Sequence, residues 1–137
     1  MTPDDFISTA EKLLADPCNE GDKRSAISRS YYGAYHGCIE SLPDGYTPAN
    51  SEFQSSESHK AVIDAVARWG KDLVPGRTDA QQAARRLSYL KKARKKADYE
   101  IGAAMDERAA ASCVNDCRFV LDHIRRARER FNQTEAA

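Results

Sequence analysis

The sequence contains no long hydrophobic run. No stretch approaches the roughly 20 apolar residues that a membrane-spanning helix requires. The N-terminal stretch Met1–Phe6 is acidic, whereas a secretion signal begins with basic residues followed by apolar ones. These two absences predict a cytoplasmic protein without a membrane partner.

An excess of charge of one sign is also lacking. The 137 residues carry 21 Lys and Arg against 21 Asp and Glu, so the formal net charge is +0. A strongly basic protein of the kind that binds nucleic acid over its whole surface is therefore excluded. Nucleic-acid binding would depend on local segregation of basic residues.

Cysteine is sparse, and its spacing fits no metal or redox motif. Cys113 and Cys117 stand at i and i+4 rather than as Cys-x-x-Cys, while Cys18 and Cys38 lie far from them. Without a secretion signal we expect all four thiols to be reduced, with three of them as small core residues. The histidines supply no ligand spacing, and neither a Gly-rich phosphate loop nor a Gly-x-Ser-x-Gly motif occurs. We predict neither a metal nor a cofactor.

Strand-like alternation, repeats and linkers are absent, whereas helical periodicity is present throughout. It predicts five helices, over residues 3–15, 20–42, 56–73, 78–102 and 106–131, with an irregular loop over 43–56. Asn19 is expected to cap the second helix, and Thr78 with Gln81 to form a capping box on the fourth. The pattern predicts a single all-α domain over 1–137, an antiparallel up-and-down four-helix bundle with an additional short helix. Residues 132–137 are expected to form a disordered tail.

The aromatic, acid-free stretch Arg24–Cys38 has two helical faces. We expect the first in the core; it carries Ile27, Tyr31, Ala34, Tyr35, Cys38 and Leu42. The second carries Arg29, Tyr32 and His36 at i, i+3 and i+7, and we expect it at a groove or a dimer surface. An arginine and a histidine on one face have the chemistry to hold a phosphate and move a proton, although a structural role is the simpler alternative.

An arginine interrupts the apolar stripe of the helix predicted over 78–102. The stripe consists of Ala83, Leu87, Leu90, Arg94, Ala97 and Ile101. A buried arginine requires a partner, and Asp98 at i+4 can supply one. Two roles remain open: Arg94 and Asp98 lock this helix to its neighbour with Tyr99 packed beside them, or Arg94 binds a phosphate in an electropositive groove.

Basic residues are concentrated in two places. One cluster lies on the helix predicted over 78–102 and contains Arg85, Arg86, Lys91, Lys92, Lys95 and Lys96; the other lies near the end of the last helix and contains Arg125, Arg126, Arg128 and Arg130. With Tyr89 and Tyr99 interleaved, the first cluster has the composition of a surface that binds single-stranded nucleic acid. The alternative is a solvated helix face.

Two motifs together resemble the HEPN family, and in particular its small stand-alone prokaryotic members. They are RSAISRSYYGAYH at Arg24–His36, followed by Leu87-x-x-Leu90-x-x-x-Arg94-x-x-x-Asp98-Tyr99. The likeness covers nearly the whole chain, including the order of the helices. It implies an all-α up-and-down bundle that forms a homodimer. It also implies an association with RNA or with nucleotidyltransferase-like partner proteins in toxin–antitoxin or defence modules.

Many HEPN proteins are metal-independent ribonucleases with an arginine followed a few residues later by histidine on a late helix. Arg94 matches that arginine, but Asp98 and Tyr99 stand where the histidine is expected. An aspartate is ionised at neutral pH and cannot supply the proton that histidine supplies. Arg29 and His36 have a similar spacing, but they lie on an earlier helix.

Three functional hypotheses follow. The first is a dimeric binding module for RNA, a nucleotide or a partner protein, with binding residues Arg94, Asp98, Tyr99, Tyr32, Lys91 and Lys95. The second is an active ribonuclease, with Arg94, His36 and Arg29 as catalytic candidates. The third is a structural partner subunit without nucleic-acid contact.

Overall fold

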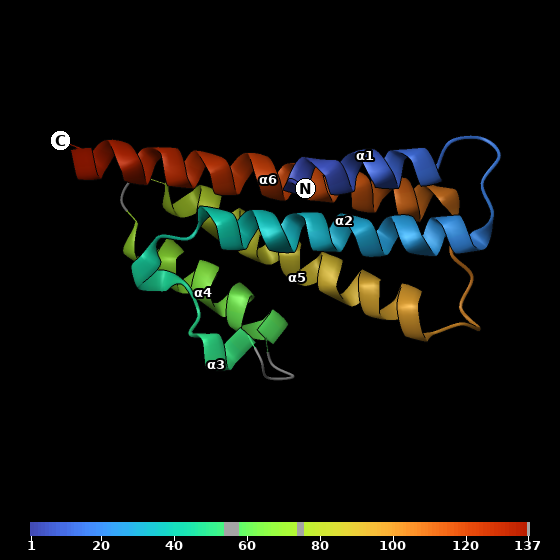
Figure 1. The fold of residues 1–137 in the computed structure, drawn as a ribbon, viewed down its shortest axis with the longest axis horizontal. Helices are drawn as coiled ribbons and strands as arrows, with labels where there is room; N and C mark the ends of the chain where they lie inside the picture. The colour runs from blue at the N-terminus through green and yellow to red at the C-terminus, as the bar shows by residue number, and fades with distance from the viewer. Residues whose placement is uncertain (54–57, 74–75, 137) are drawn as a thin grey trace.

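The computed structural model describes residues 1–53, 58–73 and 76–136, and all regular secondary structure in these ranges is helical. The elements are α1 (Pro3–Leu13), α2 (Glu20–Ser41), the 3₁₀ turn η1 (Asp44–Tyr46), α3 (Asn50–Phe53), α4 (Ser58–Asp72), α5 (Arg77–Tyr99) and α6 (Glu107–Ala136) (Figure 1). The predicted all-α class is confirmed. Among the helices of the described ranges, none combines the length and apolarity needed to cross a membrane.

The first two helices begin with reciprocal capping hydrogen bonds. The Asn19 side chain accepts from the backbone N–H of Asp22 at 2.8 Å, and the Asp22 carboxylate accepts from the Asn19 N–H at 3.0 Å. Thr2 and Asp5 make the equivalent capping box on α1. These bonds satisfy N–H groups that a helix start leaves without partners. The predicted cap at Asn19 is therefore confirmed.

The start of α5 differs from its prediction. Its N-cap is Gly76, with a left-handed φ of 102°, and the helix begins at Arg77. Thr78 consequently lies inside the first turn, so the capping box predicted for Thr78 and Gln81 is wrong. A left-handed φ is readily adopted by glycine because it has no Cβ.

The end of α5 is determined by Arg24 from α2. The helix ends at Tyr99 rather than near Gly102, and Ile101, predicted in the core stripe, is 82% exposed. The Arg24 guanidinium donates to the carbonyls of Ala97, Glu100, Ile101 and Ala103. These contacts supply donors and positive charge at a helix C-terminus, where carbonyls lack intrahelical partners. They also fix the position of the last turn of α5, which carries Asp98 and Tyr99.

Two further segments differ from the sequence-based expectation. The loop predicted over 43–56 contains η1 and α3, although its last residues lie outside the described ranges. Helix α6 continues to Ala136, through most of the segment expected to be a disordered tail.

Helix α2 is the central element, and it packs against α1, α4, α5 and α6. Figure 1 shows α1, α2, α5 and α6 lying along the long axis, with consecutive helices running in opposite directions, while α4 packs on α5. Two glycines allow this close packing: a Cβ on Gly37 would lie 2.1 Å from Leu121 Cδ2, and one on Gly33 would lie 2.9 Å from Phe6 Cβ. The core contains Ile27, Tyr31, Leu87 and Leu90 from the predicted stripes, together with Val66, Trp69 and Leu121.

Three of the cysteines belong to this core, as predicted. Cys38 and Cys117 are 0% exposed, Cys113 is 7% exposed, and all three are free thiols. Burial raises the pKa of Cys113 to about 11 and that of Cys117 to about 12, so both remain protonated at neutral pH. Thiols in this state act as small apolar side chains rather than as nucleophiles or ligands.

Candidate anion-binding site

The Arg94 side chain is buried against tyrosine rings. The residue is 8% exposed, and its guanidinium carbon lies 5.5, 5.9 and 5.9 Å from the ring centres of Tyr31, Tyr32 and Tyr99. One hydrogen bond joins Nη1 to Asp98 Oδ2 at 3.4 Å, and the buried Nε has no partner among the described residues. The expected burial of Arg94 and its pairing with Asp98 are confirmed.

These contacts compensate the buried charge of Arg94 only in part. A guanidinium carries five N–H donors, and burying a cation costs several kcal/mol unless it is well paired. The bond to Asp98 is long, and that carboxylate keeps 30% of its side-chain surface exposed to water. Each aromatic ring adds on the order of 0.5–2 kcal/mol of cation–π attraction. The described residues therefore compensate the charge of Arg94 incompletely, which makes the site a candidate for binding a second anion.

His59 also lies beside this arginine. It comes from α4, and its Nδ1 lies 2.6 Å from the hydroxyl of Tyr31. Its ring centre is 5.0 Å from Tyr35 and 6.0 Å from Tyr32. The same Tyr31 ring that contacts Arg94 thus holds the imidazole of His59.

The surroundings of His59 keep its ring neutral, and its hydrogen bond to Tyr31 indicates which ring nitrogen carries the proton. Desolvation lowers its pKa below 6.5, and Arg94, Lys91 and Lys95 lower it further. Burial raises the pKa of Tyr31 well above 10, so the phenol keeps its proton. A phenol O–H is a stronger donor than an imidazole N–H, and an imidazole nitrogen is a stronger acceptor than a phenol oxygen, so we assign Tyr31 as the donor to Nδ1 and the ring proton of His59 to Nε2. His59 is then a neutral hydrogen-bond donor in a region of positive potential.

The structure brings together the six residues predicted to form a binding site. Lys91 and Lys95 lie on α5 next to Arg94, and both act on the pKa of His59. Within the described part of the chain neither lysine forms an ion pair. Tyr99 is 73% exposed. We call the group the Arg94 cluster: Arg94, Lys91, Lys95, Asp98, Tyr99 and Tyr32, together with His59.

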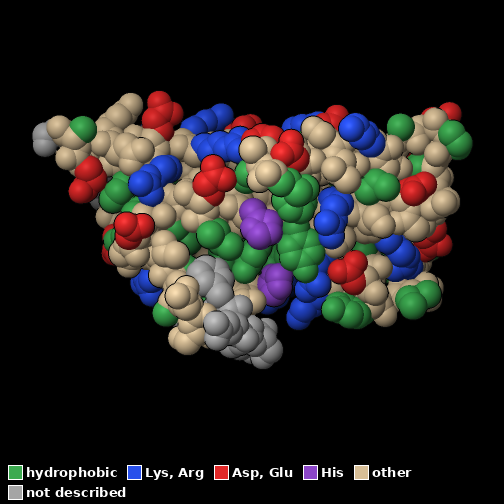
Figure 2. Space-filling model, viewed as in Figure 1, with side chains coloured by type: hydrophobic (Ala, Val, Ile, Leu, Met, Phe, Trp, Pro, Cys, Tyr) green, Lys and Arg blue, Asp and Glu red, His purple; other side chains and the backbone are tan. Residues whose placement is uncertain are grey.

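Arg29 and His36, the other catalytic candidates, flank a neighbouring pair of rings. Arg29 lies over the rings of Phe6 and Tyr32 at 5.8 and 5.6 Å. His36 stacks on Phe6 at 5.5 Å and lies 6.4 Å from Tyr32, and desolvation lowers its pKa. Tyr32 is therefore the link between His36 and Arg94. Figure 2 shows two histidines on this face with hydrophobic side chains around them and Lys and Arg side chains along one side.

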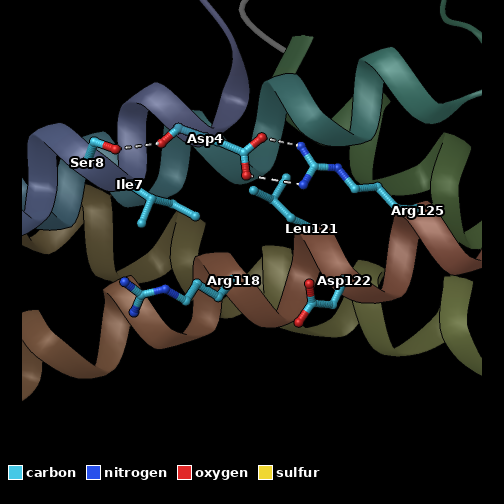
Figure 3. A pocket seen from close by; sticks show the side chains of 7 residues that line it. All are labelled: Asp4, Ile7, Ser8, Arg118, Leu121, Asp122 and Arg125. Atoms are coloured by element: carbon cyan, nitrogen blue, oxygen red, sulfur yellow. Dashed lines mark hydrogen bonds and ion pairs between the residues drawn. The ribbon is translucent and has the colours of Figure 1, made fainter.

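A second concave region lies between α1 and α6, and its arginines are paired. It is an open cavity of about 340 Å³ with Ile7 and Leu121 among its lining residues. In Figure 3 the guanidinium of Arg125 meets the carboxylate of Asp4 through two bonds, of 2.6 and 3.2 Å. Arg118 pairs with Glu11 at 2.7 Å. Both arginines of this cavity are therefore already paired with carboxylates of the protein.

Other basic residues also make structural contacts. Arg128 donates to the Ser41 carbonyl at 3.2 Å, and Arg130 lies 3.9 Å from Asp79, which also meets His123. Across residues 1–53, 58–73 and 76–136, no three or more His, Cys, Asp or Glu side chains are grouped to hold a metal ion. Comparisons of the chain with protein-family models, with curated proteins and with solved structures return no match.

Proposed function

We propose that the Arg94 cluster binds a phosphate of single-stranded RNA. The observation that carries this proposal is a buried guanidinium that, among the described residues, has one 3.4 Å hydrogen bond and no partner at Nε. Arginine is well suited to phosphate because its planar fork forms two parallel hydrogen bonds to the oxygens. Lys91 and Lys95 add charge at the same place, and His59 adds a neutral N–H donor.

A nucleic-acid strand fits the site better than an isolated small anion does, because an exposed ring adjoins the positive charge. Tyr99, whose ring centre lies 5.9 Å from the Arg94 guanidinium, is 73% exposed, and Tyr89 on the same helix is 54% exposed. Aromatic side chains interleaved with basic ones bind single strands by stacking bases while the charges hold the phosphates. Stacking contributes about 1–3 kcal/mol per base.

Binding is better supported than cleavage. Cleavage by the RNA 2′-hydroxyl requires a base that takes up the proton. The imidazole of His59 lies beside Arg94, and an imidazole next to an arginine favours the ribonuclease alternative. In the tautomer assigned above, however, Nδ1 is occupied by the Tyr31 hydroxyl and Nε2 already carries a proton. Apart from His59, the carboxylate of Asp98 lies near the position that the phosphate would occupy, and it accepts a hydrogen bond from Arg94.

We infer in addition that α1, α2, α5 and α6 form an up-and-down four-helix bundle of the HEPN type, with α4 as the additional helix. Support comes from the alternating directions of these helices and from the motifs on α2 and α5 meeting at Arg94 and Tyr31. We further propose a homodimer, which light scattering would detect, and a nucleotidyltransferase-like protein as a candidate partner. A monomer at all concentrations would contradict the dimer alone.

Fluorescence anisotropy with a labelled single-stranded RNA tests the binding proposal. We expect affinity to fall steeply with salt, because phosphate contacts release counterions. Arg94→Gln should weaken binding about tenfold or more and reduce the salt slope by about 1. Lys12→Gln, an exposed position on α1 outside both basic clusters, is the matched control and should change affinity far less.

Two outcomes would contradict the proposal. Equal affinity of the wild type and Arg94→Gln, with an unchanged helical circular-dichroism spectrum, would remove Arg94 from the site. RNA cut in the presence of chelator, and left intact by His59→Ala, would replace the binding function with the ribonuclease alternative.

A further inference from the structure

An open cavity lies at the start of α1, and its lining residue His36 lies 6.4 Å from Tyr32 of the Arg94 cluster. It has a volume of about 400 Å³ and is lined by Met1, Thr2, Pro3, Phe6, His36, Ile39 and Glu40. This volume is within the range of roughly 300–1,000 Å³ that is usual for small-molecule sites. The lining combines apolar and aromatic side chains with few polar groups, which is the usual composition of such sites.

The walls of this cavity suit a flat heterocycle. Phe6 and His36 are stacked with an interplanar angle of 26°, so one wall contains two nearly parallel rings. Desolvation lowers the pKa of His36, which keeps its ring neutral at pH 7 and able to stack like an aromatic side chain. Planar aromatic ligands gain from offset stacking on such rings.

The polar groups of the cavity select against an anion and in favour of an N–H donor. Glu40 is exposed and lies one helical turn after His36 on α2, and a carboxylate accepts hydrogen bonds without donating any. A phosphate would be repelled by Glu40, whereas the donor edge of a nucleobase would be bound. Guanine presents two adjacent N–H donors, from N1 and from the 2-amino group, which match the two oxygens of one carboxylate.

A continuous series of rings joins this cavity to the phosphate site. Tyr32 lies 5.9 Å from the guanidinium of Arg94 and 6.4 Å from the ring of His36. Arg29 lies over both Phe6 and Tyr32 and adds a cation between the two sites. One strand therefore has a path along which a phosphate rests on Arg94 while a nearby base enters the cavity.

We propose that the cavity at Phe6, His36 and Glu40 is a nucleobase subsite that selects guanine through the Glu40 carboxylate. The inference of a strand running through both sites rests on the proposed RNA binding at Arg94. The selection of guanine does not, because the cavity has its own aromatic wall and its own hydrogen-bonding group.

Nucleosides test the cavity without any phosphate. The probes are guanosine and uridine, titrated at up to about 1 mM while the imidazole signals of His36 are followed by NMR. We expect guanosine to shift these signals and uridine to leave them nearly unchanged. Glu40→Gln should abolish the response, because an amide offers one acceptor and adds donors. Glu129→Gln, an exposed position on α6, is the control and should respond like the wild type.

Short RNAs then test the coupling of the two sites. A uridine heptamer with one central guanosine should bind about tenfold tighter than the all-uridine heptamer. Glu40→Gln should remove that ratio and keep the affinity for the all-uridine strand, whereas Arg94→Gln should weaken both strands. No response of His36 to guanosine would overturn the subsite while leaving RNA binding intact. A guanosine response without any RNA binding would overturn the proposed function and keep the subsite.

Discussion

Two arginine-containing regions of this protein contrast in how their charges are compensated. In the cavity between α1 and α6, Arg125 and Arg118 are 44% exposed at the side chain and each meets a carboxylate on α1 at 2.6–2.7 Å. In the Arg94 cluster, the guanidinium is 9% exposed at the side chain and, within the described ranges, meets one carboxylate at 3.4 Å. The better-hydrated arginines thus have the shorter ion pairs.

The difference is consistent with a structural role for the first region and with the proposed binding role for the second. Exposed pairs such as Arg125–Asp4 stabilise by about 0–1 kcal/mol and need no further ligand. A buried and incompletely paired cation destabilises the fold, and it persists where its charge has another use. The tyrosines around Arg94 exclude water, which strengthens the attraction of any anion that binds there.

The largest effect is expected from Arg24→Ala, which removes the support of the Arg94 cluster. Arg24 donates to five carbonyls in the last turn of α5 and just beyond it, and its side chain is 15% exposed. We expect a loss on the order of 2–3 kcal/mol in the free energy of unfolding, from hydrogen bonds between a charged group and half-buried or exposed carbonyls. Urea denaturation measures it. Arg125→Ala is the comparison variant. An equal loss in its free energy of unfolding would show that Arg24 and Arg125 stabilise the fold by the same amount.

The next effect has the opposite sign. Arg94→Met replaces the buried cation by an apolar side chain of similar length, and we expect unfolding to become about 1–2 kcal/mol more costly. RNA binding should be lost in the same variant, since a stabilised site loses its function when the strained group is the functional one. Arg125→Met should change stability by less than about 1 kcal/mol. Clear destabilisation by Arg94→Met would show that Asp98 and the rings already compensate the charge.

Sequence periodicity was sufficient to locate the buried faces of α2, α5 and α6 and the anomaly at Arg94. A repeat of 3.6 residues orients a side chain whatever its chemistry, so an arginine on the stripe is visible as such. Two other features required tertiary contacts. Ile101 fits the repeat, but α5 ends before it, where Arg24 binds the last carbonyls. Thr78 fits the pattern of a capping box, but the helix already begins after the left-handed Gly76.

The contacts of His59 in the candidate site were likewise not predictable from the sequence. His59 belongs to α4, while Arg94 belongs to α5 and Tyr31 to α2, and spacing along the chain carries no information on how three helices meet. Its hydrogen bond to Tyr31 became visible only in the packed structure. A histidine on the apolar stripe of its helix, as at position 59, was the available signal, because a buried imidazole needs a polar partner.

The smallest effect concerns the pKa values of His59 and His36. It distinguishes the Arg94 cluster, which contains His59, from the neighbouring cavity that His36 lines. His59 and His36 both have pKa values lowered from 6.5, and the neighbouring cations Arg94, Lys91 and Lys95 contribute to the shift of His59 alone. Arg94→Met should therefore raise the pKa of His59 and leave that of His36 in place, as measured by NMR titration.

Because both groups bind protons more readily in the unfolded chain, the free energy of unfolding should fall as pH drops from about 7 through the folded pKa values, and then level off. In Arg94→Met this fall should be shallower, since the folded and unfolded pKa values of His59 lie closer together. An unchanged His59 titration would mean that the charge of Arg94 is already neutralised within the protein, and the contrast with the α1–α6 cavity would then disappear.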